Sequence, residues 1–141
     1  MKTRQKGTAI VEFALILPLL LLLTMITTEF GRAIYQYNTI VKSLRNATRY
    51  LSLQTQNTQI TEAQNLVVFG NIAGTGTALV PGLTVSQVTP TWLRIESVPP
   101  INTVTITVTG YTFRSMFTSV FGVTFGDKIF ADISATMRSP S

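Results

Sequence analysis

The N-terminal part of the chain is strongly apolar, and this limits what the whole protein can be. Residues 8–28 contain one charged side chain, Glu12, and residues 13–23 are uninterrupted apolar sequence. At about 1.5 Å per residue, a helix of this length reaches about 30 Å, the hydrocarbon thickness of a bilayer. We therefore predict a transmembrane helix over residues 8–30, preceded by a short basic leader at residues 1–7.

The apolar segment does not resemble a cleaved secretory signal, which would be cut just after its apolar residues. A cleaved signal needs a small-x-small site there, and the sequence TMITTEFGRAIYQY after Leu23 offers no good one. Helical spacing also continues on one face. The positions on that face are Ile34, Tyr37, Val41, Leu44, Thr48 and Leu51. We predict one helix from about residue 8 to about residue 53, with an amphipathic continuation over residues 31–55 that lies under a soluble domain.

The basic leader bears on both net charge and topology. Lys2, Arg4 and Lys6 precede the apolar segment, and without them eight basic residues stand against six acidic ones. This nearly neutral balance argues against nucleic acid as a partner. Basic side chains favour the cytoplasmic side, and the six residues nearest the span hold more of them before it than after it. We therefore expect a single-pass protein with a cytoplasmic N-terminus.

Two residues inside the span are unusual for a plain anchor. Pro18 removes one backbone donor and crowds the carbonyl of Ala14, so we expect a kink, either harmless or a point where the helix bends or melts during assembly. An ionised Glu12 costs on the order of 3 kcal/mol in a bilayer, unless it reaches the headgroups or finds a cation. Cleavage after Gly7 would free an α-amine on Thr8. Paired with Glu12 of a neighbouring subunit, that amine would set the axial offset between packed helices.

A resemblance to a known family rests on the residues around Gly7. The sequence GTAIVE (7–12), followed by Phe13, resembles the processing site of type IV prepilins. The wider string GTAIVEFALILPLLL, and then EFGR at residues 29–32, is similar to the TadE-like branch, the pilin-like proteins of tight-adherence (Flp) pilus systems. Major Flp pilins are much shorter, so the resemblance implies a minor pilin or pseudopilin.

The resemblance also implies roles and partners. A prepilin peptidase would cut between Gly7 and Thr8, and Glu12 would be the assembly acid at the fifth mature position. The implied partners are other pilin or pseudopilin subunits and the inner-membrane assembly platform. The domain would lie outside the cytoplasm of a bacterium, with entry into the surface pilus left open. Two other interpretations remain: an extracytoplasmic binding module with an unprocessed signal anchor, and a secreted domain with a conventionally cleaved signal.

Residues 56–141 are predicted to form the extracytoplasmic α+β domain. Thr61 and Glu62 favour a short helix that ends at Gly70, and the Gly-rich residues 71–82 read as a loop. Alternation of apolar and polar residues predicts strands at 83–88, 92–98, 103–109 and 129–137. The predicted fold class is α+β and pilin-like, with a long N-terminal helix packed on a small antiparallel sheet of about four strands.

Residues 113–126 are apolar and aromatic, and they read as a loop with at most one helical turn. Either their apolar side chains cap one edge of the core, or they form an exposed patch for a partner subunit or the membrane surface. These side chains are Phe113, Met116, Phe117, Val120, Phe121 and Phe125.

The residue types present leave little room for catalysis. The chain has no Cys and no His, which excludes disulfides, zinc sites with those ligands, His bases and Cys nucleophiles. The acids beyond the helix form no recognisable pair, and no motif supports a Ser–Lys dyad. These acids are Glu62, Glu96, Asp127 and Asp132. We expect no enzymatic activity and no cofactor.

Overall fold

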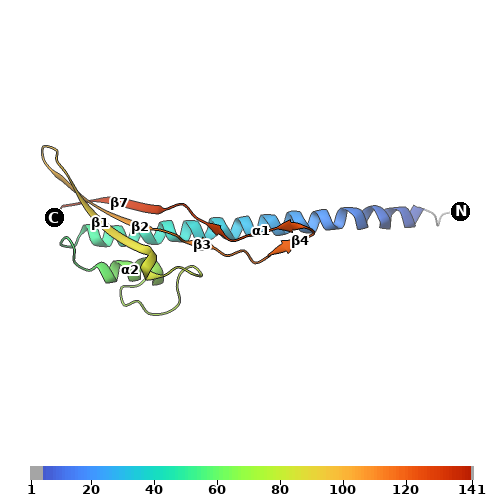
Figure 1. The fold of residues 1–141 in the computed structure, drawn as a ribbon, viewed down its shortest axis with the longest axis horizontal. Coiled ribbons are helices and arrows are strands. Elements are labelled where there is room, and N and C mark those ends of the chain that lie inside the picture. Colours follow the sequence, from blue (N-terminus) through green and yellow to red (C-terminus); the bar gives the residue numbers. More distant parts are fainter. Residues whose placement is uncertain (1–4, 141) are drawn as a thin grey trace.

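The computed structural model describes residues 5–140, and its main element is the helix α1, Gln5–Ser52. This confirms the predicted long helix to within a few residues, and α1 runs without interruption through Pro18. Figure 1 shows its N-terminal half extending away from the rest of the chain. The most apolar 18-residue window of α1 contains no buried residue. One half of α1 is thus free to cross a membrane by length and composition, and the other half carries the domain.

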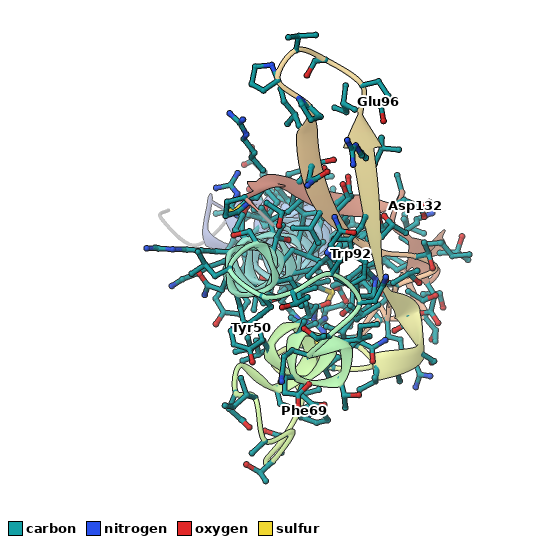
Figure 2. All side chains as sticks on the ribbon, turned by 90° about the vertical axis from the view of Figure 1, so that its left-hand side faces the viewer. Tyr50, Phe69, Trp92, Glu96 and Asp132 are labelled. Carbon is teal, nitrogen blue, oxygen red and sulfur yellow. The ribbon has the colours of Figure 1, made fainter. Side chains whose placement is uncertain are left out.

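The domain packs a second helix and a small sheet against α1. The helix α2, Ile60–Phe69, confirms the predicted short helix, and Gly70 ends it with a φ of 76°. The sheet is antiparallel, in the order β1-β2-β7, with β1 at Val88–Ile95, β2 at Ile101–Val108 and β7 at Ile133–Ser139. Figure 2 views the molecule from the domain end, with the β1–β2 hairpin and Glu96 projecting on one side and α2 with Phe69 on the other. The α+β class is confirmed.

Three details of the predicted sheet are wrong. Residues 83–87 form no strand, and Val88 is the first residue of β1. The Gln87 side chain accepts a hydrogen bond from the Thr84 N–H (2.9 Å) and closes a 3₁₀ turn, η1, Val85–Gln87. The strand predicted at 129–137 is divided between β6, Lys128–Ile129, and β7. The main sheet accordingly has three strands where about four were expected.

The region predicted as a loop also contains strands. Residues 113–126 overlap two short antiparallel pairs, which lie outside the main sheet. One pair joins β3, Thr112–Phe113, to β6, and the other joins β4, Ser119–Val120, to β5, Val123–Thr124. Strands of two residues carry too little alternation to be recognised from sequence.

The core lies between the C-terminal half of α1, α2 and β2. The predicted alternation in β2 is confirmed, because Val104, Ile106 and Val108 are all buried. The buried face of α1 is rotated from the predicted stripe: Ile34 and Tyr37 are about half exposed. Gln36, Ile40, Ser43 and Ala47 are buried in their place, together with the predicted Leu44, Thr48 and Leu51. The buried face differs from the predicted stripe because it includes the small residues Ser43 and Ala47 and the hydrogen-bonded Gln36.

Tyr111 connects α1 to the loop before the sheet. Its side chain is 1% exposed, and its hydroxyl lies 2.8 Å from Gln36 Oε1 and 3.0 Å from the Pro81 carbonyl oxygen, donating its proton to them. Burial raises the pKa of the Tyr111 phenol above its ordinary value of 10.0, although the charge of Arg32 opposes the shift. The hydroxyl therefore acts as a donor throughout the physiological pH range.

We predict that Tyr111→Phe lowers the free energy of unfolding by about 1–3 kcal/mol, because the buried Gln36 amide oxygen loses its donor. Urea unfolding of the full chain in detergent micelles, followed by circular dichroism, measures the change. Tyr35→Phe is the matched control, since Tyr35 is 70% exposed, and it should change stability by less than about 0.5 kcal/mol. Equal stability of the two variants would contradict the role of the Tyr111 hydroxyl.

The same group makes stability sensitive to alkali. Because the folded pKa of Tyr111 lies above 10.0, the unfolded chain loses this proton first as pH rises. The contribution is complete below pH 10.0 and is lost as pH rises towards the folded pKa. Wild-type protein should therefore lose stability more steeply above pH 10.0 than Tyr111→Phe, as the same urea titrations repeated across pH would show.

Candidate functional site

The residues of the predicted processing site lie together on the free end of α1. Gly7, Thr8 and Glu12 are all exposed. A Cβ placed on Gly7 would meet no atom within 4 Å, so the fold of the described chain does not itself require glycine there. Lys2 and Arg4 of the leader lie outside the described residues, and only the backbone of Lys6 is described.

Glu12 has no cation close by on the span. Residues 7–31 contain no basic side chain, so the next cation along α1 is Arg32, twenty residues on and about 30 Å away along the axis. A partner for the Glu12 carboxylate has to come from the leader, from an amino terminus created by cleavage, or from another molecule. Pro18 is half buried inside the continuous helix, and the kink there stays a prediction.

A second site lies where the apolar segment ends. Glu29 is 7% exposed, and its Oε2 accepts a hydrogen bond from Arg32 Nη1 at 2.9 Å. Its Oε1 accepts hydrogen bonds from Ser115 Oγ, at 3.1 Å, and from the backbone N–H of Met116. We call this arrangement the Glu29 clasp. It joins α1 to a segment 86 residues further along the chain.

The segment held by the clasp is an extended ribbon, residues 111–130, which we call the arm. The Phe130 N–H donates to the Tyr111 carbonyl (2.9 Å) at its base, and the Phe125 N–H donates to the Thr118 carbonyl (3.0 Å) near its tip. The β3–β6 and β4–β5 pairs lie at intervals along it. In Figure 1 the arm runs back beside α1, with β4 nearer to the N-terminus than β3 or the main sheet.

Aromatic contacts hold the base of the arm on α1. The Arg32 guanidinium lies 5.3 Å from the centroid of the Phe113 ring, and the Phe113 and Phe130 rings stack with their centroids 6.3 Å apart. Tyr37 of α1 meets Phe130 edge to face at 5.9 Å. A cation over an aromatic face and aromatic pairs each contribute about 0.5–1.5 kcal/mol. Arg32 therefore belongs to the clasp and also contacts Phe113 at the base of the arm.

The apolar cluster predicted at 113–126 is divided in two. Phe113 is buried and caps the core, which agrees with the first of the two alternatives predicted for these side chains. Further along the arm, Met116 at the clasp and Phe121 at the tip are 65% and 63% exposed. Phe117, Val120 and Phe125 are half buried between them. The base of the arm thus belongs to the core, whereas its tip presents apolar side chains.

Sequence reasoning noted Glu29 and Arg32 only as part of a family resemblance. Their spacing of three residues on a helix was enough to predict the ion pair. Their contact with Ser115 and Met116 had no signal in the sequence, because it joins residues that are distant along the chain. Within residues 5–140 no three acidic side chains gather to hold a metal ion.

The fold and the two sites define the class of protein. An exposed apolar half-helix, continuous with a helix that packs into a small α+β domain, is consistent with a pilin-like architecture and with a single-pass membrane anchor. Residues 7–49 match the family of TadE-like proteins, and this match includes Gly7, Glu12, Pro18 and the Glu29 clasp residues of α1. The resemblance to the TadE-like family is therefore confirmed over this segment. No curated protein and no solved structure matches the chain.

The family match suggests a broad setting for residues 7–49. TadE-like proteins are associated with tight-adherence pili and are structural rather than catalytic. The matched segment contains the apolar half of α1 and most of the part that packs into the domain. Over this segment the chain thus resembles pilus-associated proteins, and its long apolar helix fits a single-pass membrane anchor.

The Glu29 clasp makes a prediction about local stability. Glu29→Ala removes the acceptor of two arm donors, and hydrogen bonds to a charged group contribute about 1.5–3 kcal/mol. Hydrogen exchange at the Met116 amide should therefore be faster by about tenfold or more, as mass spectrometry of the full chain in micelles would show.

The control for this prediction is another acid that forms an ion pair. Glu96 lies 3.2 Å from Arg94, but its side chain is 82% exposed. Exposed ion pairs contribute about 0–1 kcal/mol, so Glu96→Ala should leave exchange at Met116 unchanged. Unchanged exchange in Glu29→Ala itself would show that the arm does not depend on the clasp.

Proposed function

We propose that this protein is a minor pilin or pseudopilin, matured by a prepilin peptidase, that acts in assembly of a tight-adherence pilus at the bacterial inner membrane. In this proposal the N-terminus is cytoplasmic and the domain lies outside the cytoplasm. The observation that carries it is the placement of Gly7, Thr8 and Glu12 on the exposed first turns of α1, within the TadE-like match.

The open space around Gly7 supports the processing step. Because a Cβ there would meet nothing in the described chain, a requirement for glycine would come from an enzyme that binds this segment. Hydrolysis of the Gly7–Thr8 bond by water would leave a carboxylate on Gly7 and an ammonium group on Thr8. Glu12 would then be the fifth residue of the mature chain.

The surface of the free half of α1 supports assembly through helix packing. Large apolar side chains are exposed all round it, such as Phe13 at 60%, Leu15 at 76% and Leu19 at 68%. A helix that is apolar on every side needs lipid or other helices around it. Apolar packing by itself leaves the axial offset between subunits free. A pair between Glu12 and the Thr8 ammonium of a neighbour would select one offset, because an unpaired carboxylate in that environment is costly.

The first test concerns processing. We predict that wild-type protein isolated from membranes begins at Thr8, whereas Gly7→Val protein keeps its leader, as N-terminal mass spectrometry would show. Gly31→Val is the matched control, because Gly31 also lies in α1 with open space around its Cβ position. It should still be cut at Thr8.

Other N-termini would contradict the proposal and identify its alternatives. Wild-type protein that begins at Met1 would be an unprocessed anchor carrying a binding module. A start near residues 25–35 would be that of a secreted domain with a conventional signal.

The second test concerns Glu12. Glu12→Ala should leave cleavage at Thr8 intact but lower the number of assembled pili by about tenfold or more, if the acid–amine pair contributes at least about 1.5 kcal/mol. Electron microscopy of whole cells counts the pili, and Glu96→Ala serves as the control acid. Normal piliation in the Glu12→Ala strain would contradict the role assigned to Glu12.

A further inference from the structure

The arm and α1 both change from charged to uncharged sequence, and they do so at the same height along the molecule. In α1 the uncharged stretch 13–28 ends at Glu29, and in the arm the uncharged stretch is 115–126. The Glu29 clasp joins these two boundaries, because the Glu29 carboxylate binds Ser115 and Met116. Two segments distant in sequence therefore lose their charges at one height along the molecule.

Beyond this boundary the arm continues along the apolar part of α1. Thr124 and Phe125 line a cleft of about 380 Å³ together with Ile26, which lies one turn further into the span than Glu29 or Phe30. Among the strands labelled in Figure 1, β4 lies nearest to the free half of the helix. The β4–β5 turn thus lies beside the last turns of the segment that is long and apolar enough to cross a bilayer.

The tip of the arm is apolar and open. Phe121 and Gly122 form the turn, with φ angles of 49° and 80°, a left-handed conformation that a bulky side chain rarely adopts. Asn or Asp would occupy the first of these positions with less strain, so a large aromatic there calls for an external reason. Phe121 is 63% exposed, and its neighbour Val123 is 41% exposed.

Charged side chains return on both strands at the boundary. Arg114 precedes the uncharged stretch, Asp127 and Lys128 follow it, and all three are exposed. Asp127 Oδ1 accepts a hydrogen bond from the Ser115 N–H at 3.1 Å, so this acid has a partner within the arm. Arg114 and Lys128 are left as cations at the height where phosphate headgroups would lie if α1 spans the bilayer.

We propose that the arm is a second membrane contact, whose tip inserts among the phospholipids of the leaflet that faces the domain. Phe121, Val123 and Met116 lie among the acyl chains next to the headgroups, and Arg114 and Lys128 bind lipid phosphates. This inference rests on α1 as the membrane anchor, and it holds whether or not the chain is cleaved at Gly7. A bilayer is the occupant that the positions favour, because the anchor itself carries the tip to that depth.

A membrane-inserted arm would fix the tilt and rotation of the domain on its anchor. One helix leaves rotation about its own axis free, and a second contact to the side removes that freedom. The apolar cleft between the arm and α1 would then open towards acyl chains and exclude water.

The chain offers a direct test, because Trp92 is its single tryptophan. Within the described part of the chain the buried Trp92 Nε1 has no hydrogen-bond partner, so Trp92→Phe removes no hydrogen bond. In this background Phe121→Trp places one indole at the tip of the arm, replacing an aromatic by an aromatic. Val98→Trp places it at the tip of the β1–β2 hairpin, where Val98 is fully exposed.

Both variants are reconstituted as full chains, one copy per nanodisc, in phosphatidylethanolamine and phosphatidylglycerol. We expect acyl-brominated lipids to quench the Phe121→Trp emission at least about twofold more than that of Val98→Trp. Aqueous acrylamide should quench in the opposite order. Val123→Trp, on β5, repeats the measurement outside the turn. It serves as the second variant if Phe121→Trp perturbs the turn.

Two results would overturn the proposal. If acrylamide quenches Phe121→Trp and Val123→Trp as strongly as Val98→Trp, the tip lies in water. If neither quencher reaches the tip, protein covers it, and the surface is a docking site for a subunit. Since these readouts do not involve cleavage or piliation, their failure is distinct from failure of the proposed function.

Discussion

A helix that leaves a bilayer has to exchange an all-apolar surface for one that is apolar on a single face, and α1 makes this change near Glu29. Between Gly7 and Thr28 no residue of α1 is buried, and large apolar side chains are exposed around the helix. After it, the buried side includes Gln36, Ile40 and Leu44. The domain core assembles on that side alone, and the arm reaches the last turns of the free half near Ile26. The rest of that half keeps its surface for lipid or for other helices.

The Glu29 clasp lies at this change and joins the two parts of the chain that meet there. A carboxylate that is 7% exposed has to be satisfied by donors, and Arg32, Ser115 and the Met116 amide supply them. The charge of Glu29 is thus compensated within the protein. Glu12, by contrast, has no basic residue near it in the span, which leaves its carboxylate available to a partner.

Glu29 and Glu12 lie on the same helix but in different surroundings. Glu29 organises the protein itself, by holding the arm in register along α1. Glu12 lies exposed on the free half of α1, in a stretch with no basic residue from 7 to 31. The TadE-like match covers both residues, although their environments differ completely. The matched segment therefore contains one acid that is bound within the fold, Glu29, and one that is exposed on the free half of α1, Glu12.

The sequence by itself determined the long helix, its apolar half, α2 and the alternation of β2, because these depend on periodic patterns within one segment. It did not determine the arm, the three-stranded sheet or the rotation of the buried face of α1. Residues 113–126 contain only two-residue strands, and Gln36 is buried because a distant tyrosine, Tyr111, donates to it. Only the tertiary structure decided these features, since each depends on a contact between residues far apart in the chain, and no local pattern records such a contact.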